Sequence, residues 1–245
     1  MLYGEIPLAI FEIFFRASQI LGTPINISNN TSSSQGPQVT SSGNNVYVTW
    51  YDNTPGNFDI FFRVSNNNGG TFGIPINISN NGGSSARPQI AVSGNNVYVT
   101  WTDFTPGLPE IFLAASTNNG GSFGIPVNIS NNFGSSESPQ IALSGNNIYV
   151  TWQDTNLGNM EIFFAASNNN GTSFGTSINL SNNAGFSMIP QIVTSGNNVY
   201  VTWQDNIFGG NDILVISNNQ PFGFGTPINI SNNLGFSENP QIAAS

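Results

Sequence analysis

Acidic side chains are the residues of this chain best suited to chemistry, and ten of the twelve fall at two repeated positions. The first set is Glu5, Asp52, Asp103, Asp154 and Asp205, and the second, seven residues further on in each copy, is Glu12, Asp59, Glu110, Glu161 and Asp212. Two neighbouring carboxylates can perform glycoside hydrolysis. Carboxylates can also bind Ca²⁺ through oxygen ligands or accept hydrogen bonds from loop amides.

The repetition favours the last of these roles. Catalysis normally needs two acids in different environments. A pair that is repeated in every copy of the sequence has the same environment each time. Two alternatives stay open. One is a Ca²⁺ site at Asp52, Asp103, Asp154 and Asp205, the only cofactor that the sequence suggests. The other is catalysis by Glu5 and Glu12, which flank the divergent loop of the first copy; without it, no catalytic residue is predicted.

Candidates for ligand binding come from the same acids and from aromatic residues in the loops beside them. The candidate acids are Asp52, Asp59, Asp103, Glu110, Asp154, Glu161, Asp205 and Asp212, and the aromatic candidates are Phe58, Phe104 and Phe208. These phenylalanines belong to variable loops that are expected to share one face of the molecule. Apolar side chains gathered on a loop face predict a contact surface for a ligand, a partner or another copy.

Composition excludes several classes of function. Only 6% of the 245 residues are charged, and the net charge of -9 leaves almost nothing to neutralise a phosphate backbone, so nucleic-acid binding is excluded. Cys and His are absent, which excludes disulfides, thiolate nucleophiles and zinc chemistry. No apolar stretch of about 20 residues is present to span a bilayer, and the N-terminus lacks a signal peptide. Low charge with abundant Asn, Ser, Thr and Gly predicts a secreted or cell-surface protein.

The acids are positioned by a repeat of 51 residues, marked by Trp50, Trp101, Trp152 and Trp203. A fixed period near 50 is typical of propellers and solenoids. Each copy opens on Pro-Gln and continues through Ser-Gly-Asn-Asn to Tyr-Val-Thr-Trp-x-Asp. The two ends of the chain are complementary fragments of one copy, which predicts five copies in all. The alternation phase of the tryptophans favours burial between copies over exposure as sugar platforms.

Each copy contains four predicted strands and no helical periodicity. In one copy they are Gln89 to Ser93, Val97 to Asp103, Glu110 to Ser116 and Ile125 to Ser130. Apolar residues occupy both faces of the inner strands, so both faces must be covered. Blades stacked around an axis provide that cover.

The sequence therefore predicts an all-β protein, residues 1–245, forming a single five-bladed β-propeller of four-stranded antiparallel blades. The ring is expected to close when the C-terminal strand Gln241 to Ser245 joins three N-terminal strands, Met1 to Glu5, Glu12 to Ser18 and Thr23 to Ser28. Closure of this kind protects the strand edges.

The hairpin between the third and fourth strands carries a further pattern. Ser65-Asn66-Asn67-Asn68-Gly69-Gly70-Thr71-Phe72 is echoed by Ser116 to Phe123 and Ser167 to Phe174. This resembles the Asp-box, Ser-x-Asp-x-Gly-x-Thr-Trp, of the sialidase-like BNR/Asp-box repeat β-propellers, with Asn for Asp and Phe for Trp. In that family the box is a folding device on the face away from the active site. Two copies depart from it: Pro221 interrupts Ser217 to Phe224, and Ser18 to Gly22 has lost it.

The resemblance implies carbohydrate recognition more than sialidase chemistry. Sialidases of the family bind a carboxylate with three Arg and use a Tyr nucleophile paired with Glu, plus an Asp acid. Here Arg16, Arg63 and Arg87 are not expected to converge, and Tyr47 and its equivalents belong to the repeat. We therefore expect a noncatalytic binding or scaffolding propeller whose partners are glycans or a surface protein. A glycoside hydrolase using a carboxylate pair and a self-assembling structural protein are the alternatives.

Overall fold

Strands make up every regular element of the described chain, as the repeat predicts. The computed structural model describes residues 11–16, 23–156, 158–218, 223–233 and 235–244. Four antiparallel four-stranded sheets follow one another, preceded by the two-stranded sheet of β1 (Phe14–Phe15) and β2 (Ile25–Asn26). None of the described residues forms a helix long and apolar enough to cross a membrane.

The four complete sheets have the same strand order, from an inner first strand to an outer fourth strand. The first strands are β3 (Ser34–Ser42), β7 (Ser85–Ser93), β11 (Ser136–Ser144) and β15 (Ser187–Ser195). The second strands are β4 (Asn45–Asp52), β8 (Asn96–Asp103), β12 (Asn147–Asp154) and β16 (Asn198–Asp205). The third strands are β5 (Asp59–Ser65), β9 (Glu110–Ser116), β13 (Glu161–Ser167) and β17 (Asp212–Asn218). The fourth strands are β6 (Ile76–Asn77), β10 (Val127–Asn128), β14 (Ile178–Asn179) and β18 (Ile228–Asn229).

Two strand boundaries differ from those expected. The first strands begin four residues earlier than predicted, at Ser85 instead of Gln89 in one copy, because a β-bulge between Ala86 and Gln89 absorbs the proline without ending the pairing. The fourth strands pair over only two residues. Beyond these two residues, Ile129 N still donates to Ile111 O at 2.7 Å, and the Ile129 side chain is buried against the sheet.

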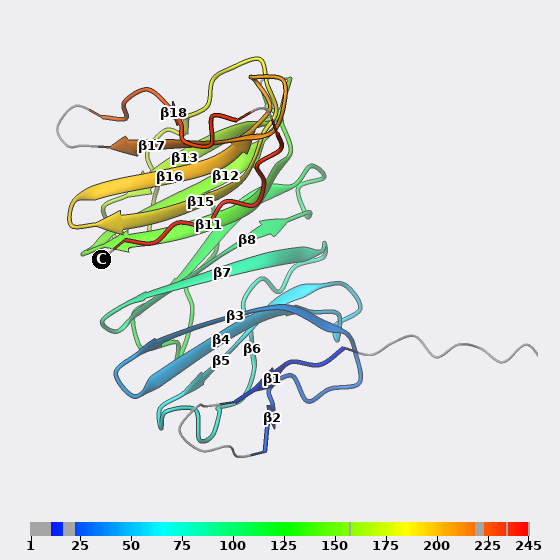
Figure 1. Ribbon diagram of the computed structural model, residues 1–245. Coiled ribbons are helices and arrows are strands. Elements are labelled where there is room, and N and C mark those ends of the chain that lie inside the picture. The colour runs from blue at the N-terminus through cyan, green and yellow to red at the C-terminus, as the bar shows by residue number, and fades with distance from the viewer. Residues whose placement is uncertain (1–10, 17–22, 157, 219–222, 234, 245) are drawn as a thin grey trace, which may run out of the picture.

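The sheets lie side by side with their first strands inward, as Figure 1 shows for β3, β7, β11 and β15. Apolar residues of neighbouring blades fill the space between sheets. In one interface Ile111 and Leu113 of β9 pack with Val150 and Trp152 of β12. All four tryptophans are buried, with at most 1% exposure, which confirms that they are packing residues.

The predicted closure of the ring is not formed by the described residues. Residues 235–244 pair with neither β1 nor β2, and Figure 1 shows the C-terminal end well separated from that sheet. The strand expected to lie between them, Met1 to Glu5, is outside the described residues, as is Ser245.

The hairpins after the third strands are held by their own serine and asparagine side chains. Ser65 Oγ accepts from Gly69 N at 2.9 Å, and Asn67 Oδ1 accepts from Thr71 N at 2.9 Å. The box phenylalanine then packs edge-on against the preceding blade, with Phe72 and Phe15 ring centroids 5.2 Å apart. Ser18 to Gly22 and most of the Pro221 turn lie outside the described residues.

Candidate functional site

The aspartate that ends each second strand is buried and surrounded by donors. Asp154 Oδ2 accepts from Asn132 Nδ2 at 2.7 Å, from Ser136 Oγ at 2.6 Å and from Trp152 Nε1 at 2.8 Å. Its Oδ1 accepts from Asn156 N at 2.7 Å. Asn132 follows the fourth strand of the preceding blade, so one carboxylate fastens two blades and the loop that follows it.

The other copies repeat this arrangement. Asp52, Asp103 and Asp205 each accept an Asn amide, a Ser hydroxyl, a Trp indole and a loop backbone amide. None of the three side chains is more than 1% exposed. The indole explains why Trp precedes the aspartate by two residues in all four complete blades: the same side chain fills the space between blades and donates to the carboxylate.

The described acids at the third-strand position are also hydrogen-bonded; the four in the complete blades are buried, and Glu12 is half-buried. Asp59 accepts from Asn77 Nδ2 at 2.7 Å and from Ser79 Oγ at 3.0 Å. Glu161 accepts from the Ser181 hydroxyl. The remaining members, Glu110 and Asp212, likewise accept a serine hydroxyl, and Glu12 accepts the Asn26 amide. These contacts hold the short fourth strand against the third. Glu5 lies outside the described residues.

Burial and hydrogen bonding shift the pKa values of two of these carboxyl groups in opposite directions. Burial raises the pKa of Asp52, but hydrogen bonds from Ser34, Thr54 and Asn30 outweigh it and hold the pKa below its ordinary value. For Glu110, burial raises the pKa, the Ser130 and Asn132 hydrogen bonds offset only part of this, and the nearby charge of Asp154 adds to the rise.

The raised pKa of Glu110 predicts that the stability of the fold depends on pH. Its folded pKa lies above the ordinary value of 4.5, so its contribution to stability is present below that pH and is lost as the pH rises through the folded pKa. Glu110→Gln should remove this decline, because the amide oxygen still accepts from Ser130 and carries no charge. Urea denaturation of both proteins between about pH 4 and pH 7 measures it; parallel curves would contradict the assignment.

The donor sets fit hydrogen bonding and do not fit a cation. The oxygens of Asp52, Asp103, Asp154 and Asp205 face N–H and O–H groups, whereas Ca²⁺ requires six to eight oxygen ligands. Across the described ranges, no three His, Cys, Asp or Glu side chains gather into a metal-binding group. The hydrogen bonds of all eight candidate acids therefore support a structural role for them.

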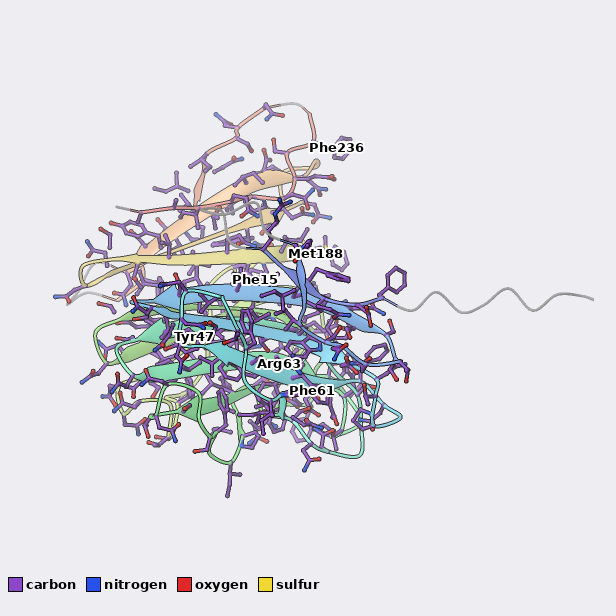
Figure 2. The ribbon with its side chains drawn as sticks, turned by 90° about the horizontal axis from the view of Figure 1, so that it is seen from below. Phe15, Tyr47, Phe61, Arg63, Met188 and Phe236 are labelled. Atoms are coloured by element: carbon purple, nitrogen blue, oxygen red, sulfur yellow. The ribbon has the colours of Figure 1, made fainter. Side chains whose placement is uncertain are left out.

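The candidate phenylalanines lie at different depths. Phe208 is 63% exposed and Phe104 is 38% exposed, so both face solvent from the loops after the second strands. Phe58 is half-buried and packs edge-on against Tyr51, with ring centroids 5.3 Å apart. Phe133 and Phe236 lie in the loops after the fourth strands β10 and β18, and they are more exposed still. Figure 2 shows Phe236 at the edge of the molecule.

A pocket of about 340 Å³ lies between the N-terminal parts of the four first strands, β3, β7, β11 and β15. We call it the axial pocket. Each first strand contributes the glutamine of its Pro-Gln pair: Gln38, Gln89, Gln140 and Gln191. These side chains are half-buried, and among the described residues their amides make no hydrogen bond to another side chain. Tyr51 adds an aromatic wall.

The residue before each proline also lines the axial pocket, and it has a positive φ in every copy: Gly36, Arg87, Ser138 and Ile189, at 56–57°. Left-handed backbone is rare for a β-branched residue such as Ile189, and such strained positions gather at ligand sites. At Gly36 a Cβ would lie 2.5 Å from Tyr51 Cε1, so the glycine makes room for the tyrosine ring.

Arg87, which lines the axial pocket, forms an ion pair with Glu137 on the adjacent blade. Its partners remain accessible, with side chains 50% and 28% exposed. Neither Arg87 nor Tyr51 was among the ligand candidates predicted from the sequence, and Arg87 lies within β7. The sequence held one signal for this site: Pro-Gln is the same in every copy, but the residue before it differs from copy to copy.

No family model matches this chain, and no curated protein matches it in sequence. Solved structures share its fold. A protein of unknown function from Dyadobacter fermentans aligns with a TM-score of 0.60 and 12% identity, over 82% of this chain and 70% of that one. A Trypanosoma rangeli sialidase in complex with the inhibitor DANA aligns with a TM-score of 0.58 and 15% identity, over 90% of this chain and 41% of the sialidase.

A family 117 glycoside hydrolase from the marine bacterium Zobellia galactanivorans aligns with a TM-score of 0.55 and 12% identity, over 90% of this chain and 77% of that one. At such low identity the likeness concerns the fold alone. The chain therefore has the propeller architecture found in these enzymes.

Proposed function

We propose that this protein is a noncatalytic carbohydrate-binding propeller of the cell surface or extracellular space, and that the axial pocket is its binding site. The single observation that carries the proposal is the lining of the pocket. Four half-buried glutamine amides beside the ring of Tyr51 offer donors, acceptors and an aromatic surface. Sugar hydroxyls require such donors and acceptors, and the C–H face of a sugar ring packs on an aromatic side chain.

Two further facts support a glycan as the ligand class. Structures of the same fold include a sialidase and a glycoside hydrolase, whose names describe action on carbohydrates. The box hairpins with Asn for Asp resemble those of the sialidase-like propellers, and their serine and asparagine side chains are used within the turn. Arg87, the charged residue of the pocket lining, is paired with Glu137, and the net charge of -9 favours a ligand without a polyanionic backbone.

The carboxylates support binding without turnover. Glycoside hydrolysis uses two carboxyl groups about 5 to 9.5 Å apart. The residues that line the axial pocket include no carboxylate, and Glu137, beside the lining residue Ser138, is held in an ion pair by Arg87. The buried acids are occupied by their donors, so they are not free to protonate or attack a glycosidic bond.

The proposal is tested by glycan-array screening followed by calorimetric titration of the best ligand. Tyr51→Ala and Gln89→Ala should each weaken binding roughly tenfold, equivalent to about 1.4 kcal/mol, without lowering the unfolding temperature by more than a few degrees. Phe133→Ala, on a fully exposed loop residue, serves as the control and should bind normally. Loss of binding in Phe133→Ala alone would show that the glycan binds to the loops and not in the axial pocket. Release of reducing ends from the glycan would show that the protein is a hydrolase.

A further inference from the structure

A glutamine side chain fastens the start of the following blade in two places. Gln153 Oε1 accepts from Ile189 N at 3.2 Å, and Gln204 Oε1 accepts from Asn239 N at 3.3 Å. Ile189 and Asn239 both precede a proline and have positive φ values of 56° and 55°. Ile189 lies inside the β-bulge of β15, outside the register pairs of its ladder. The glutamine therefore supplies an acceptor that the sheet does not.

Thr102 holds the position of this glutamine in β8, and it is too short to make the same bond. The residue that corresponds to Ile189 in the following blade is Ser138, which lies in the bulge of β11 with a φ of 56°. The threonine oxygen is two bonds nearer the backbone than a glutamine Oε1, so it stops about 2.5 Å short. Among the described residues, no side chain accepts from the Ser138 N–H.

The Thr102 hydroxyl is itself unsatisfied by the protein. The side chain is completely buried, and its Oγ1 has no hydrogen-bond partner among the described residues. Nearly all buried hydroxyls in proteins are bonded to protein groups or to ordered water, because an unsatisfied one is costly. Thr100, two residues earlier in β8, obeys this rule: its Oγ1 donates to Phe112 O at 2.8 Å. The free groups of Thr102 and Ser138 therefore point to a small bound molecule between them.

Arg87 reaches the same bulge from the blade that carries Thr102. Its Nη1 donates to the Glu137 carboxylate and, at 3.5 Å, to Ser138 Oγ. Arg87 and Ser138 both line the axial pocket. The ion pair thus joins these two blades where Gln153 joins the next two. A space with several polar partners holds water, whereas a purely apolar cavity stays dry.

We propose that one ordered water molecule lies between Thr102 Oγ1 and Ser138 N and forms part of the wall of the axial pocket. A shortfall of about 2.5 Å matches the difference between a direct hydrogen bond and one bridged by a single water. The water accepts from the Ser138 N–H and from the Thr102 hydroxyl, so its own two hydrogens stay available. It offers hydrogen-bond donors at this corner of the pocket.

The role of this water in recognition rests on the proposed glycan binding. The pocket glutamines repeat around the axis, whereas threonine follows the tryptophan in one blade only. A water donor beside Ser138 alone favours one orientation of a sugar, the one that places a hydroxyl or ring oxygen there. Thr102 is thus a positioning residue, which acts through the water and contacts no sugar itself.

A high-resolution crystal structure of the unliganded protein tests the water without any glycan. We expect density for a water within hydrogen-bond distance of both Thr102 Oγ1 and Ser138 N. Thr102→Gln should replace it with a direct bond to Ser138 N, and Thr102→Ser should keep it. An empty space in the wild-type map, or a direct bond from Thr102 to a protein group, would overturn the proposal.

Thr102→Val gives a second readout, because the sign of its effect depends on the water. With the water bound, valine removes one of its partners, and the unfolding temperature should fall by about 2 to 4 °C. With the hydroxyl unsatisfied, a valine of the same shape should raise it. Thr100→Val, which loses the bond to Phe112 O, is the matched control and should fall by a similar amount. A rise or no change in Thr102→Val would contradict the water.

Calorimetric titration with the glycan that ranks first on the array tests the recognition step. Thr102→Gln should weaken binding roughly fivefold, and Thr102→Ser should bind like the wild-type protein. Unchanged binding in Thr102→Gln, with binding lost in Tyr51→Ala, would keep the glycan site and remove the water from recognition. If the wild-type protein binds no glycan, the proposed function fails, whereas the crystal structure and the valine variant still decide the water.

Discussion

Asp154→Ala is expected to lower the free energy of unfolding by at least about 3 kcal/mol, because hydrogen bonds to a buried charged group contribute roughly 1.5 to 3 kcal/mol and several are lost together. The substitution leaves Asn132, Ser136 and the Trp152 indole without their common acceptor. Urea denaturation followed by tryptophan fluorescence measures the loss.

The control for Asp154 is Glu238→Ala. Glu238 is exposed and accepts one hydrogen bond, from Asn211, so its removal should change stability by no more than about 0.5 kcal/mol. Asp154→Asn should fall between the two, because the amide keeps one acceptor but turns an NH₂ group toward donors. A loss below about 1 kcal/mol in Asp154→Ala would show that the donors find other partners and that the carboxylate does not fasten the blades.

Trp152→Ala is expected to lower the free energy of unfolding by about 3 to 5 kcal/mol, the usual cost of a large aromatic side chain removed from a core. The ring is completely buried and stacks on Phe163 at a centroid distance of 6.2 Å. Its removal opens a cavity between two blades and also deprives Asp154 of a donor. The midpoint of urea unfolding gives the change.

Phe133→Ala is the matched control for Trp152→Ala, since Phe133 is 97% exposed and should be replaceable without measurable cost. Trp152→Phe separates the two contributions of the indole. It keeps most of the packing and loses the donor, so its loss should be smaller than that of the alanine variant. Equal losses in the two variants would mean that the hydrogen bond, and not the packing, dominates.

The blade architecture could be predicted because the repeat carries it. Trp50 and its equivalents fix the period, and the strand order follows from turn residues such as Gly43, which has the positive φ of 57° that its hairpin needs. Both are local properties of the sequence. The bulge before each Pro-Gln pair was not predicted, because a proline normally ends a ladder and its accommodation depends on the neighbouring blade.

The sequence favoured a structural role for the repeated acids, but it could not decide between that role, Ca²⁺ binding and catalysis. Repetition favoured a structural role, yet the donors to Asp154 come from Asn132 and Ser136, about 20 residues upstream and partly on the preceding blade. Nothing in a single strand shows that these groups converge. The same limit explains why Phe58 was a candidate while its packing partner Tyr51 was not.

The axial pocket could not be predicted because its walls are far apart in the chain. Gln38, Gln89, Gln140 and Gln191 read as identical members of a repeat, and only the geometry of the first strands brings them around one space. Arg87 and Glu137 are 50 residues apart and belong to different blades. The pocket lining combines residues that obey the repeat, the four glutamines, with residues that break it, Tyr51 and Arg87.

The most direct test of glycan binding at the axial pocket is a crystal structure of the protein with the glycan that ranks first on the array. The expected result is an intact sugar in contact with the Tyr51 ring and at least two of the four pocket glutamines, at one ligand per chain. Sugar density confined to the exposed loops of Phe133 and Phe208, or a cleaved product at any position, would contradict it.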